Sequence, residues 1–250
     1  MVRTMLTDEY WQKLRPIILQ MNIYDKAELR NTIEGFLYRM RTGLPWRDLP
    51  KEFGRWNTIY KRFNNWSKSG KLVSIFKELS KNAELEWEFF DGTVIKTHQH
   101  GMGAVNGSEK AIGKTVGGNS TKIHMAVDSM GLPIHFEVTE GQVHDSKLAR
   151  ILLEARSGFH YIIADRGYDH QVFRDEVIAK NAIPLIPRKS NSKVGNNDID
   201  WAIYSLRHLV ENIFARIKHY RGIATRYDKL KSSYEGMVAM ACSMTWLPHI

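Results

Sequence analysis

The amino-acid sequence predicts an α/β protein in which a mixed sheet flanked by helices follows a small all-helical domain. In the N-terminal part of the chain, apolar side chains recur at helical spacing. From Leu85 onward, short apolar runs alternate with turn residues, which is typical of strands. Helical patterns return around residues 204–218 and 234–247. We therefore expect a helical domain over residues 1–80 and a sheet-based domain over residues 85–250.

The helical domain contains a predicted helix-turn-helix over residues 26–66. Residues 26–41 and residues 55–66 each place apolar side chains on one face of a helix. Glycine and proline separate the two helices, because neither residue continues a helix well. These helix-breaking residues are Gly43, Pro45 and Pro50. A short helix is expected near residues 46–52, before the second long helix.

Two sets of side chains in this module have different expected roles. Exposed arginine and asparagine can bond guanine and adenine edges in the major groove of DNA, with phosphate contact or plain solubility as alternatives. The positions expected to be exposed are Arg55, Asn57, Thr58, Lys61, Arg62, Asn64 and Asn65. Aromatic residues at helical spacing usually belong to a core. Those expected in the core are Trp46, Trp56, Tyr60, Phe63 and Trp66.

The sheet-based domain begins with a predicted hairpin and continues as strand and helix units. Residues 122–131 and 132–141 read as two strands, and Asp128 suits the turn between them. Further strands and helices then alternate, and Asp145 is expected to cap the helix that follows it. Glycine and lysine are frequent at residues 101–120, which predicts a mobile basic loop.

The composition favours a polyanionic partner. Lysine and arginine total 36 against 27 acidic residues, which gives a formal charge of +9 at pH 7. Nucleic acid is the first candidate, an acidic membrane surface is the second, and a merely basic protein is the alternative. The single cysteine, Cys242, excludes an internal disulfide and a cysteine-rich zinc site. Because neither a signal peptide nor an apolar run near ~18 residues is evident, we expect a cytoplasmic protein.

Four side chains near the C-terminus form a predicted stripe along one long helix. Tyr204, Arg207, Glu211 and Lys218 lie at offsets of 0, 3, 7 and 14 residues. At about 100° per residue, these offsets fall within an arc of about 60°. The apolar face beside the stripe comprises Leu206, Val210, Ile213, Phe214 and Ile217. An acid held between cations at the edge of a buried face is a candidate functional carboxylate.

Three acids are candidate ligands for a divalent metal ion. Asp91 ends the expected strand that contains the apolar run LEWEFF, and Gly92 follows it. Asp165 ends the expected strand that contains YIIA, and Glu211 lies on the long helix. Magnesium takes hard oxygen ligands and needs few carboxylates when phosphates and water complete its shell. Taken alone, each aspartate is more often a turn residue, and Glu211 more often forms an ion pair with Arg207. The order of the three acids in a basic protein favours the metal site.

These residues lie in segments that resemble the DDE-type insertion-sequence transposases, most closely the insertion-sequence-five family. The segments are FFDGTVIKTHQ, TKIHMAVDSMGLPIHFEVTEGQVHD, IIADRGYD and YSLRHLVENIFARIKHYRGIATRYDK. The stripe fits the family's Y-x2-R-x3-E-x6-K signature at every defined position, with Glu211 as the acid. Asp91 and Asp165 match the two aspartate positions. The N-terminal segment GRWNTIYKRFNNW is also similar, so the resemblance covers about residues 5–247.

The resemblance implies a ribonuclease-H-like catalytic core that cuts DNA and joins the cut ends to new DNA. Asp91, Asp165 and Glu211 would be the catalytic residues and would hold two Mg²⁺ ions, with Mn²⁺ as a substitute. Asp91 would bridge the two ions. Three flanking side chains would contact DNA or support Glu211 on its helix. They are Tyr204, Arg207 and Lys218.

Double-stranded DNA is the implied partner, both as the terminal inverted repeats of a mobile element and as the target. The helix-turn-helix module would recognise the element's ends. Its candidate contacts are Arg55, Asn57, Lys61 and Arg62. Because two ends must be joined together, the resemblance implies a homodimer or a larger assembly on DNA. It also implies no membrane partner and a bacterial protein associated with the nucleoid.

Other functions share part of this pattern. A ribonuclease-H-like nuclease or resolvase would use the same acids without joining DNA, but it has no evident need for the N-terminal module. A domesticated transposase would bind DNA as a regulator, although three intact acids argue against that function. A tyrosine recombinase would use Tyr204, but no convincing Arg-His-Arg set accompanies it.

Overall fold

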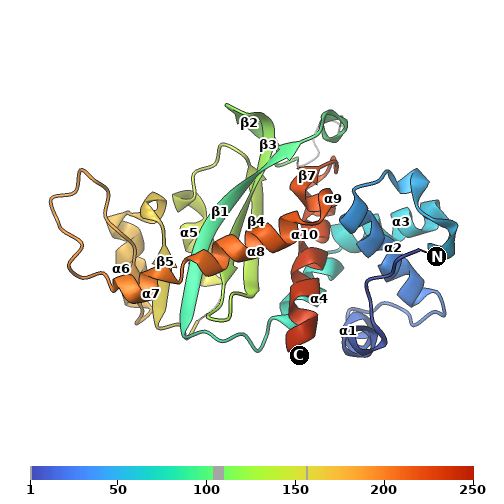
Figure 1. The fold of residues 1–250 in the computed structure, drawn as a ribbon, viewed down its shortest axis with the longest axis horizontal. Coiled ribbons are helices and arrows are strands. Elements are labelled where there is room, and N and C mark those ends of the chain that lie inside the picture. The colour runs from blue at the N-terminus through green and yellow to red at the C-terminus, as the bar shows by residue number, and fades with distance from the viewer. Residues whose placement is uncertain (1, 104–109, 156) are drawn as a thin grey trace. The chain divides into compact units, whose positions relative to one another are not determined.

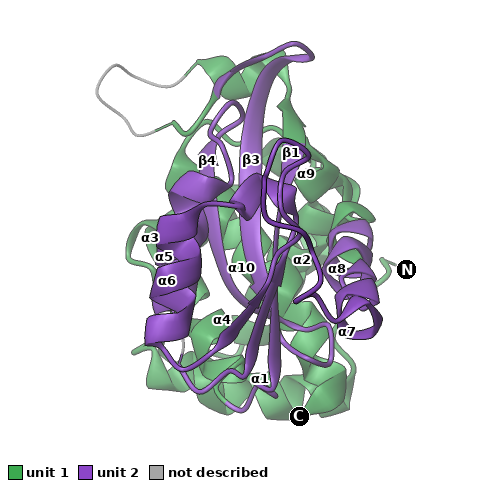
Figure 2. Ribbon diagram, turned by 90° about the vertical axis from the view of Figure 1, so that its left-hand side faces the viewer, with its two compact units in different colours: residues 1–81, 95–112, 216–250 green, residues 82–94, 113–215 purple. Residues whose placement is uncertain are grey.

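The protein is described here by a computed structural model, in which residues 2–103, 110–155 and 157–250 are placed (Figure 1). Contacts between residues divide the chain into two compact units (Figure 2). The first unit contains residues 1–81, 95–112 and 216–250. The second unit contains residues 82–94 and 113–215. The first unit thus includes the C-terminal segment as well as the N-terminal helices. The expected boundary between two domains at residues 80–85 remains a prediction.

Helices build most of the first unit. They are α1 (Asp8–Gln20), α2 (Leu29–Thr42), α3 (Trp56–Lys68), α4 (Lys71–Leu79), α9 (Arg221–Ala224) and α10 (Lys231–Trp246). The two helices predicted over residues 26–41 and 55–66 are present as α2 and α3, with two short 3-10 helices at Trp46–Asp48 and Lys51–Phe53 between them. Gly43 ends α2 in the left-handed conformation, with φ of 70°, which a residue without a Cβ adopts at little cost.

Helix α10 forms the centre of the first unit and contacts α2, α3, α4 and α9. Its side chains are buried almost all round, as expected of a helix enclosed by other helices. Tyr234 is fully buried, and its hydroxyl donates to the carbonyl of Ile223 across 2.9 Å. Cys242 is also fully buried, which confirms it as a core residue.

The second unit combines strands with helices. Its helices are α5 (Ser146–Glu154), α6 (Gln171–Ala179), α7 (Trp201–Ser205) and the first part of α8 (His208–Lys218). Figure 2 shows α5 and α6 on one side of the strands of this unit and α7 and α8 on the other. This arrangement encloses strand residues such as Phe89, Phe90 and Ile163, each with an exposed fraction of 0%.

The strands of the described residues form one seven-stranded mixed sheet. They are β1 (Trp87–Thr97), β2 (Gly113–Thr115), β3 (Gly118–Val127), β4 (Pro133–Glu140), β5 (Tyr161–Ala164), β6 (Ile183–Leu185) and β7 (Thr225–Arg226). The order β2-β3-β1-β5-β6 continues with β4 paired to β3 and β7 paired to β1. Strands β3 and β4 are antiparallel, whereas β1, β5 and β6 are parallel. The predicted mixed sheet flanked by helices is confirmed.

The predicted hairpin is present, and Asp128 holds its turn. The Asp128 carboxylate is buried and accepts backbone N–H groups from Leu132 at 2.8 Å, Met130 at 3.0 Å and Glu84 at 3.3 Å. Burial raises the pKa of Asp128, and these three donors oppose the rise. Asp128 is therefore a structural residue, as expected.

The predicted basic loop over residues 101–120 is partly wrong. Residues 113–115 form β2 and residues from Gly118 onward belong to β3, because the two segments pair as antiparallel strands. Residues 104–109 lie outside the described part of the chain, and the expectation of mobility falls on them.

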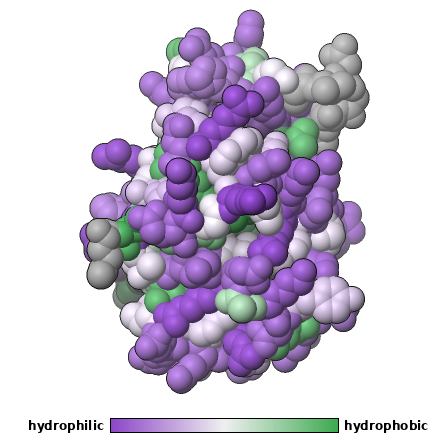
Figure 3. All heavy atoms as spheres, turned by 90° about the vertical axis from the view of Figure 1, so that its right-hand side faces the viewer, coloured by the Kyte–Doolittle hydropathy of each residue, from purple (hydrophilic) through white to green (hydrophobic). Residues whose placement is uncertain are grey.

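Hydrophilic residues dominate the face drawn in Figure 3, and hydrophobic residues occur there in small separated spots. Scattered apolar residues of this kind are ordinary on a folded protein. Within the part of the chain that the structure describes, no helix has both the length and the apolar character needed to cross a membrane.

Candidate active site

Asp91 and Asp165 lie at the same level of the sheet. Strands β1 and β5 run parallel, with Phe90 opposite Ala164; Asp91 is the next residue of β1, and Asp165 directly follows the end of β5. Adjacent strands lie about 4.8 Å apart, so the sheet brings the two carboxylates together. The expectation that Asp91 ends its strand is wrong, because β1 continues to Thr97. It is β5 that ends here, at Ala164.

Each aspartate also accepts a hydrogen bond from the backbone. Asp91 Oδ1 accepts the N–H of Gly92 at 2.7 Å, and Asp165 Oδ1 accepts the N–H of Gly167 at 2.8 Å. Burial raises the pKa of Asp91, and the charges of Asp165 and Asp145 raise it further against the opposing effects of Gly92 and Arg207. Repulsion between these acids favours a cation beside Asp91.

Arg207 links two of the candidate acids. Its Nη1 donates to Asp91 Oδ2 across 3.0 Å, and its Nη2 donates to Glu211 Oε1. The Glu211 side chain is 55% exposed, whereas that of Asp91 is 18% exposed. Among the described residues, no three His, Cys, Asp or Glu side chains are grouped so that they could hold a metal ion. The structure therefore pairs Asp91 with Asp165 and joins Glu211 to Asp91 through a guanidinium.

The predicted stripe does not lie on one continuous helix. Helix α7 ends at Ser205 and α8 begins at His208, so Arg207 lies in the turn between them. The N–H groups of Leu206 and Arg207 bond carbonyls three residues earlier, which tightens the chain relative to an α-helix. The tighter turn changes the angle between Tyr204 and Glu211 from the value that regular helical spacing predicts.

The side chains of the predicted stripe lie in different environments. Burial raises the pKa of Tyr204, with Arg207 lowering it and Asp165 raising it, which indicates that the phenol lies near these charges. Lys218 ends α8 within the first unit, and burial lowers its pKa. The apolar face beside the stripe is confirmed by Val210, Ile213, Phe214 and Ile217, which are buried, while Leu206 is half-buried.

Asp145 is a neighbour of this site that the sequence did not reveal. It occupies the N-cap position of α5, but its side chain makes no capping hydrogen bond. Instead, Asp145 Oδ2 accepts from Lys122 Nζ at 2.6 Å, and Asp145 Oδ1 lies 3.0 Å from His124 Nδ1. Although burial opposes it, these partners lower the pKa of Asp145. Lys122 and His124 are two residues apart on β3, and this strand spacing was the available signal.

Gly92 allows Asp145 to reach the strand that carries Asp91. A Cβ atom at Gly92 would lie 2.1 Å from Asp145 Oδ1 and 2.7 Å from Lys122 Cε. Only glycine leaves room for this contact. The glycine after Asp91 thus serves packing within the site rather than a turn.

The N-terminal candidates are mostly exposed, with one exception. Arg55, Asn57 and Lys61 are exposed, whereas Arg62 is half-buried and donates to Thr32 Oγ1 across 2.6 Å. Arg62 therefore supports the packing of α3 on α2, and the expectation that it is exposed is wrong. Asn64, also expected to be exposed, is half-buried, whereas Thr58 and Asn65 are exposed as predicted.

The prediction for the aromatic residues is only partly correct. Phe63 is fully buried and packs against Phe36 with ring centroids 5.2 Å apart. The other four aromatic residues are half-buried or, for Tyr60, 37% exposed. They are Trp46, Trp56, Tyr60 and Trp66. Helical spacing alone did not distinguish a core face from the wall of a cavity.

Comparison with known proteins defines the class of the protein. Residues 89–246 match the family model described as "Transposase DDE domain", and residues 6–76 match the model "Putative transposase of IS4/5 family". The chain belongs to the family of DDE transposases, and the resemblance found in its motifs is confirmed. The family implies the use of a divalent metal ion.

Relatives and solved structures are similar to different extents. The chain is 37% identical over 129 residues to a "Putative transposase for insertion sequence element IS6501" of Brucella ovis, covering 51% of this chain and 98% of that protein. It is 29% identical over 102 residues to "Uncharacterized protein y4sN" of Sinorhizobium fredii, covering 40% and 82%.

Among solved structures, the chain is similar to a piggyBac transposase in a synaptic complex with hairpin DNA, with 12% identity and a TM-score of 0.36. That match covers 76% of this chain and 44% of the piggyBac chain. It is also similar to a pre-cleavage Mos1 transpososome, with 8% identity and a TM-score of 0.29, covering 90% and 79%. The chain therefore spans less than half of the piggyBac protein.

Proposed function

We propose that this DDE transposase binds the terminal inverted repeats of an insertion sequence and catalyses metal-dependent DNA cleavage and strand transfer. The observation that carries the proposal is the pairing of Asp91 with Asp165 at one level of the sheet, with Arg207 joining Asp91 to Glu211. The name of the IS6501 relative supports the connection to an insertion sequence.

The paired aspartates fit a divalent cation. Magnesium needs only one or two carboxylates when substrate phosphates and water supply its other ligands, and Asp91 and Asp165 provide that number. The raised pKa of Asp91, caused by burial and by the nearby acids, means that a cation beside it relieves both effects. Two bound Mg²⁺ ions, or Mn²⁺ in their place, would activate the attacking hydroxyl and stabilise the leaving oxygen. Glu211 would complete the ligand set.

Arg207 has two roles in this proposal. Without DNA, its guanidinium keeps the charges of Asp91 and Glu211 compensated. With DNA, the same planar group would bond a phosphate in a bidentate manner, which would free the Glu211 carboxylate to serve as a metal ligand. The Tyr204 hydroxyl would donate a hydrogen bond to a neighbouring DNA phosphate. Lys218, farther along α8, would contact the DNA backbone. Support of the helix itself is the alternative role for both residues.

In this proposal, helix α3 recognises the ends of the mobile element. Asn57, Lys61 and Asn65 are exposed and four residues apart, so they lie on one face of the helix. Arg55, at the N-cap position, is also exposed. These side chains suit base edges and phosphates of the major groove, whereas Arg62 acts by holding α3 in place through Thr32.

The catalytic assignment is tested with isosteric variants. Purified Asp91→Asn, Asp165→Asn and Glu211→Gln are incubated with a labelled element end, magnesium and target DNA, and the products are mapped. We expect each variant to lose cleavage while it retains binding of the end, because the amide cannot replace a carboxylate as a metal ligand. Asp175→Asn, an exposed change on α6, is the matched control. Normal cleavage by any of the three variants would show that the replaced side chain is not a required metal ligand.

The same assay separates the alternatives. Cleavage without joining of a pre-cut end identifies a nuclease or resolvase, and end binding without metal-dependent nicking identifies a regulator. Point variants are preferable to deletion of residues 1–70, because the deletion would remove α2 and α3, which α10 contacts. Asn57→Ala and Lys61→Ala should weaken binding of the end, and unchanged affinity in both would remove α3 as the reading helix. Sedimentation of the protein–DNA complex tests the expected dimer or higher assembly.

A further inference from the structure

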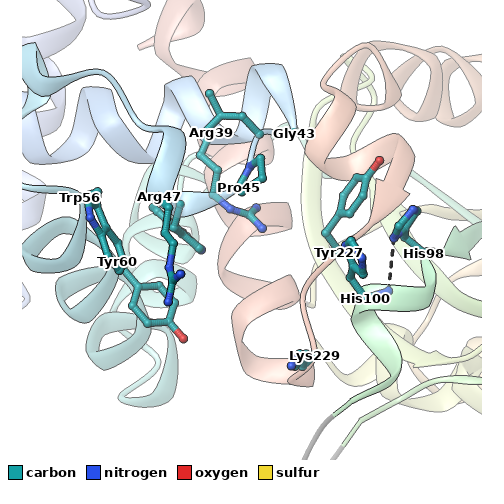
Figure 4. A pocket seen from close by; sticks show the side chains of 12 residues that line it. Arg39, Gly43, Pro45, Arg47, Trp56, Tyr60, His98, His100, Tyr227 and Lys229 are labelled. Atoms are coloured by element: carbon teal, nitrogen blue, oxygen red, sulfur yellow. Dashed lines mark hydrogen bonds between the residues drawn. The ribbon is translucent and has the colours of Figure 1, made fainter.

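A cavity of about 760 Å³ lies in the first unit, away from the helix face assigned to duplex DNA (Figure 4). Figure 4 shows Trp56, Tyr60 and Arg47 on one wall, facing His98, His100 and Tyr227 on the other. A second cavity of about 550 Å³ shares Tyr60 and Tyr227 with the first and extends the space. We call the two together the aromatic groove. Its size lies in the range of sites that hold small organic groups.

One face of α3 forms a wall of the aromatic groove. Trp56, Tyr60, Asn64 and Lys68 line it and follow one another at intervals of four residues, so they share a face of the helix. Lys61 is one residue beyond Tyr60, and at about 100° per residue it points away from this face. Helix α3 therefore presents an aromatic face to the groove and a separate polar face to solvent.

A buried arginine with unused donors faces the groove. Arg39 is 4% exposed, and its Nη2 pairs with Asp228 Oδ1 at 3.1 Å. Its Nε and Nη1 have no hydrogen-bond partner among the described residues. A buried donor without a partner costs free energy, so this position suits an incoming acceptor. Phosphate oxygens match a guanidinium in charge and in geometry.

The remaining walls combine aromatic rings with cations. The ring of His98 lies 4.8 Å from that of Tyr227, and Arg47 lies 5.6 Å from the Trp56 ring. Lys229 adds an ammonium group to the same cavity. Aromatic faces next to cations are the elements with which proteins hold unpaired nucleic-acid strands, because bases stack on rings and phosphates bind the cations.

We propose that the aromatic groove holds an unpaired DNA strand, with a base among the aromatic rings and its phosphate at Arg39 and Lys229. The site deepens the proposed function and rests on it, since it gives a DNA-processing enzyme a second contact for the strand that leaves the duplex. Duplex DNA is the competing occupant. A duplex has its bases stacked on one another, so it would gain nothing from the aromatic walls.

The test measures single-strand and duplex binding separately by fluorescence anisotropy. The probes are a labelled single strand of about 12 nucleotides and the duplex element end, each with full-length protein. Tyr60→Ala should bind the single strand roughly 10-fold more weakly and the duplex within about twofold, because one stacking contact is lost. Tyr24→Ala, at a side chain that is 84% exposed, is the matched control and should change neither affinity.

Charge variants give a second readout through the salt dependence of binding. Lys229→Gln should reduce the log–log salt slope for the single strand by about 0.7 and leave the duplex slope unchanged. Lys61→Gln should reduce the duplex slope by about 0.9 and leave the single-strand slope unchanged. If Tyr60→Ala changed the affinity for both DNA forms equally, or changed neither affinity, the proposed role of the aromatic groove would be overturned. Cleavage by the Asp91 variants reports on the proposed function separately.

Photocrosslinking of the wild-type protein tests the same proposal even if a variant misfolds. Wild-type protein is irradiated with a single strand that carries 5-iododeoxyuridine, and the adducts are mapped by mass spectrometry. Adducts should fall on peptides that contain Trp56, Tyr60 or Tyr227. Adducts found only on other peptides contradict the proposal.

Discussion

Arg207 donates to Asp91 across 3.0 Å, although the two residues come from a turn between helices and from a central strand. Burial by itself lowers the pKa of Arg207, but Asp91 and Glu211 outweigh it and raise that pKa. The same contact opposes the rise that burial causes in the pKa of Asp91. Each residue therefore stabilises the charged form of the other.

We expect Arg207→Lys to reduce the rate of DNA cleavage by roughly 10- to 100-fold, as do losses of side chains that orient metal ligands. An ammonium group is a single point charge, so it can neither bond Asp91 and Glu211 together without DNA nor bond a DNA phosphate in the bidentate manner of the planar guanidinium. Single-turnover cleavage of a saturated element end measures the effect. Arg150→Lys, at a side chain that is 70% exposed on α5, is the control. Wild-type rates in Arg207→Lys would mean that the planar guanidinium is dispensable for cleavage.

Gly92→Ala should lower the free energy of unfolding by about 1–3 kcal/mol, because the new Cβ overlaps Asp145 Oδ1. In an Asp145→Ala background, the cost of Gly92→Ala should become much smaller, since the overlapping carboxylate is gone. Urea unfolding of the four proteins measures this cycle. Gly117→Ala is the control, because only Thr115 Oγ1 lies within 4 Å of its added Cβ, at 3.9 Å. Equal costs in both backgrounds would contradict the contact.

Lys122→Met should destabilise the protein at pH 7 by about 1–3 kcal/mol, because it leaves the partly buried Asp145 carboxylate with less compensation. Asp145 has a lowered pKa in the folded state, so its contribution is present above the unfolded pKa of about 3.9 and is lost as pH falls through the folded pKa. The difference between the two proteins should therefore shrink below about pH 4.

Urea midpoints of wild type and Lys122→Met at several pH values measure that difference. Lys147→Met removes an exposed lysine from α5 and should change stability little at any pH. A difference that stays constant between pH 7 and pH 3 would show that Lys122 acts through packing rather than through charge.

Tyr234→Phe should lower the free energy of unfolding by about 1–2 kcal/mol. The change removes the donor to the Ile223 carbonyl and leaves that buried oxygen without its partner. Burial raises the pKa of Tyr234, so the phenol remains a donor over the whole accessible pH range. Thermal unfolding of Tyr234→Phe and of Tyr24→Phe compares a buried hydroxyl with an exposed one. Equal midpoints would mean that the buried bond contributes nothing.

Local patterns predicted the elements of the fold well. The helix break at Gly43, the hairpin turn at Asp128 and the strand before Asp165 each depend on a few consecutive residues. The predicted continuous helix from Tyr204 to Lys218 failed because its apolar face persists across the turn at Arg207. Hydrophobic periodicity reports which side is buried, and a short 3-10 turn does not interrupt that signal.

The sequence by itself determined the order of the three acids, the family to which their motifs belong and the type of most elements. Tertiary structure decided which side chains meet. Parallel pairing of β1 and β5 places Asp91 beside Asp165. Gly92, which has no Cβ, leaves room for Asp145. The turn before α8 places Arg207 within hydrogen-bonding distance of Asp91. The physical reason is that turns and periodicities arise from neighbours along the chain, whereas these contacts join segments that only the packed sheet brings together.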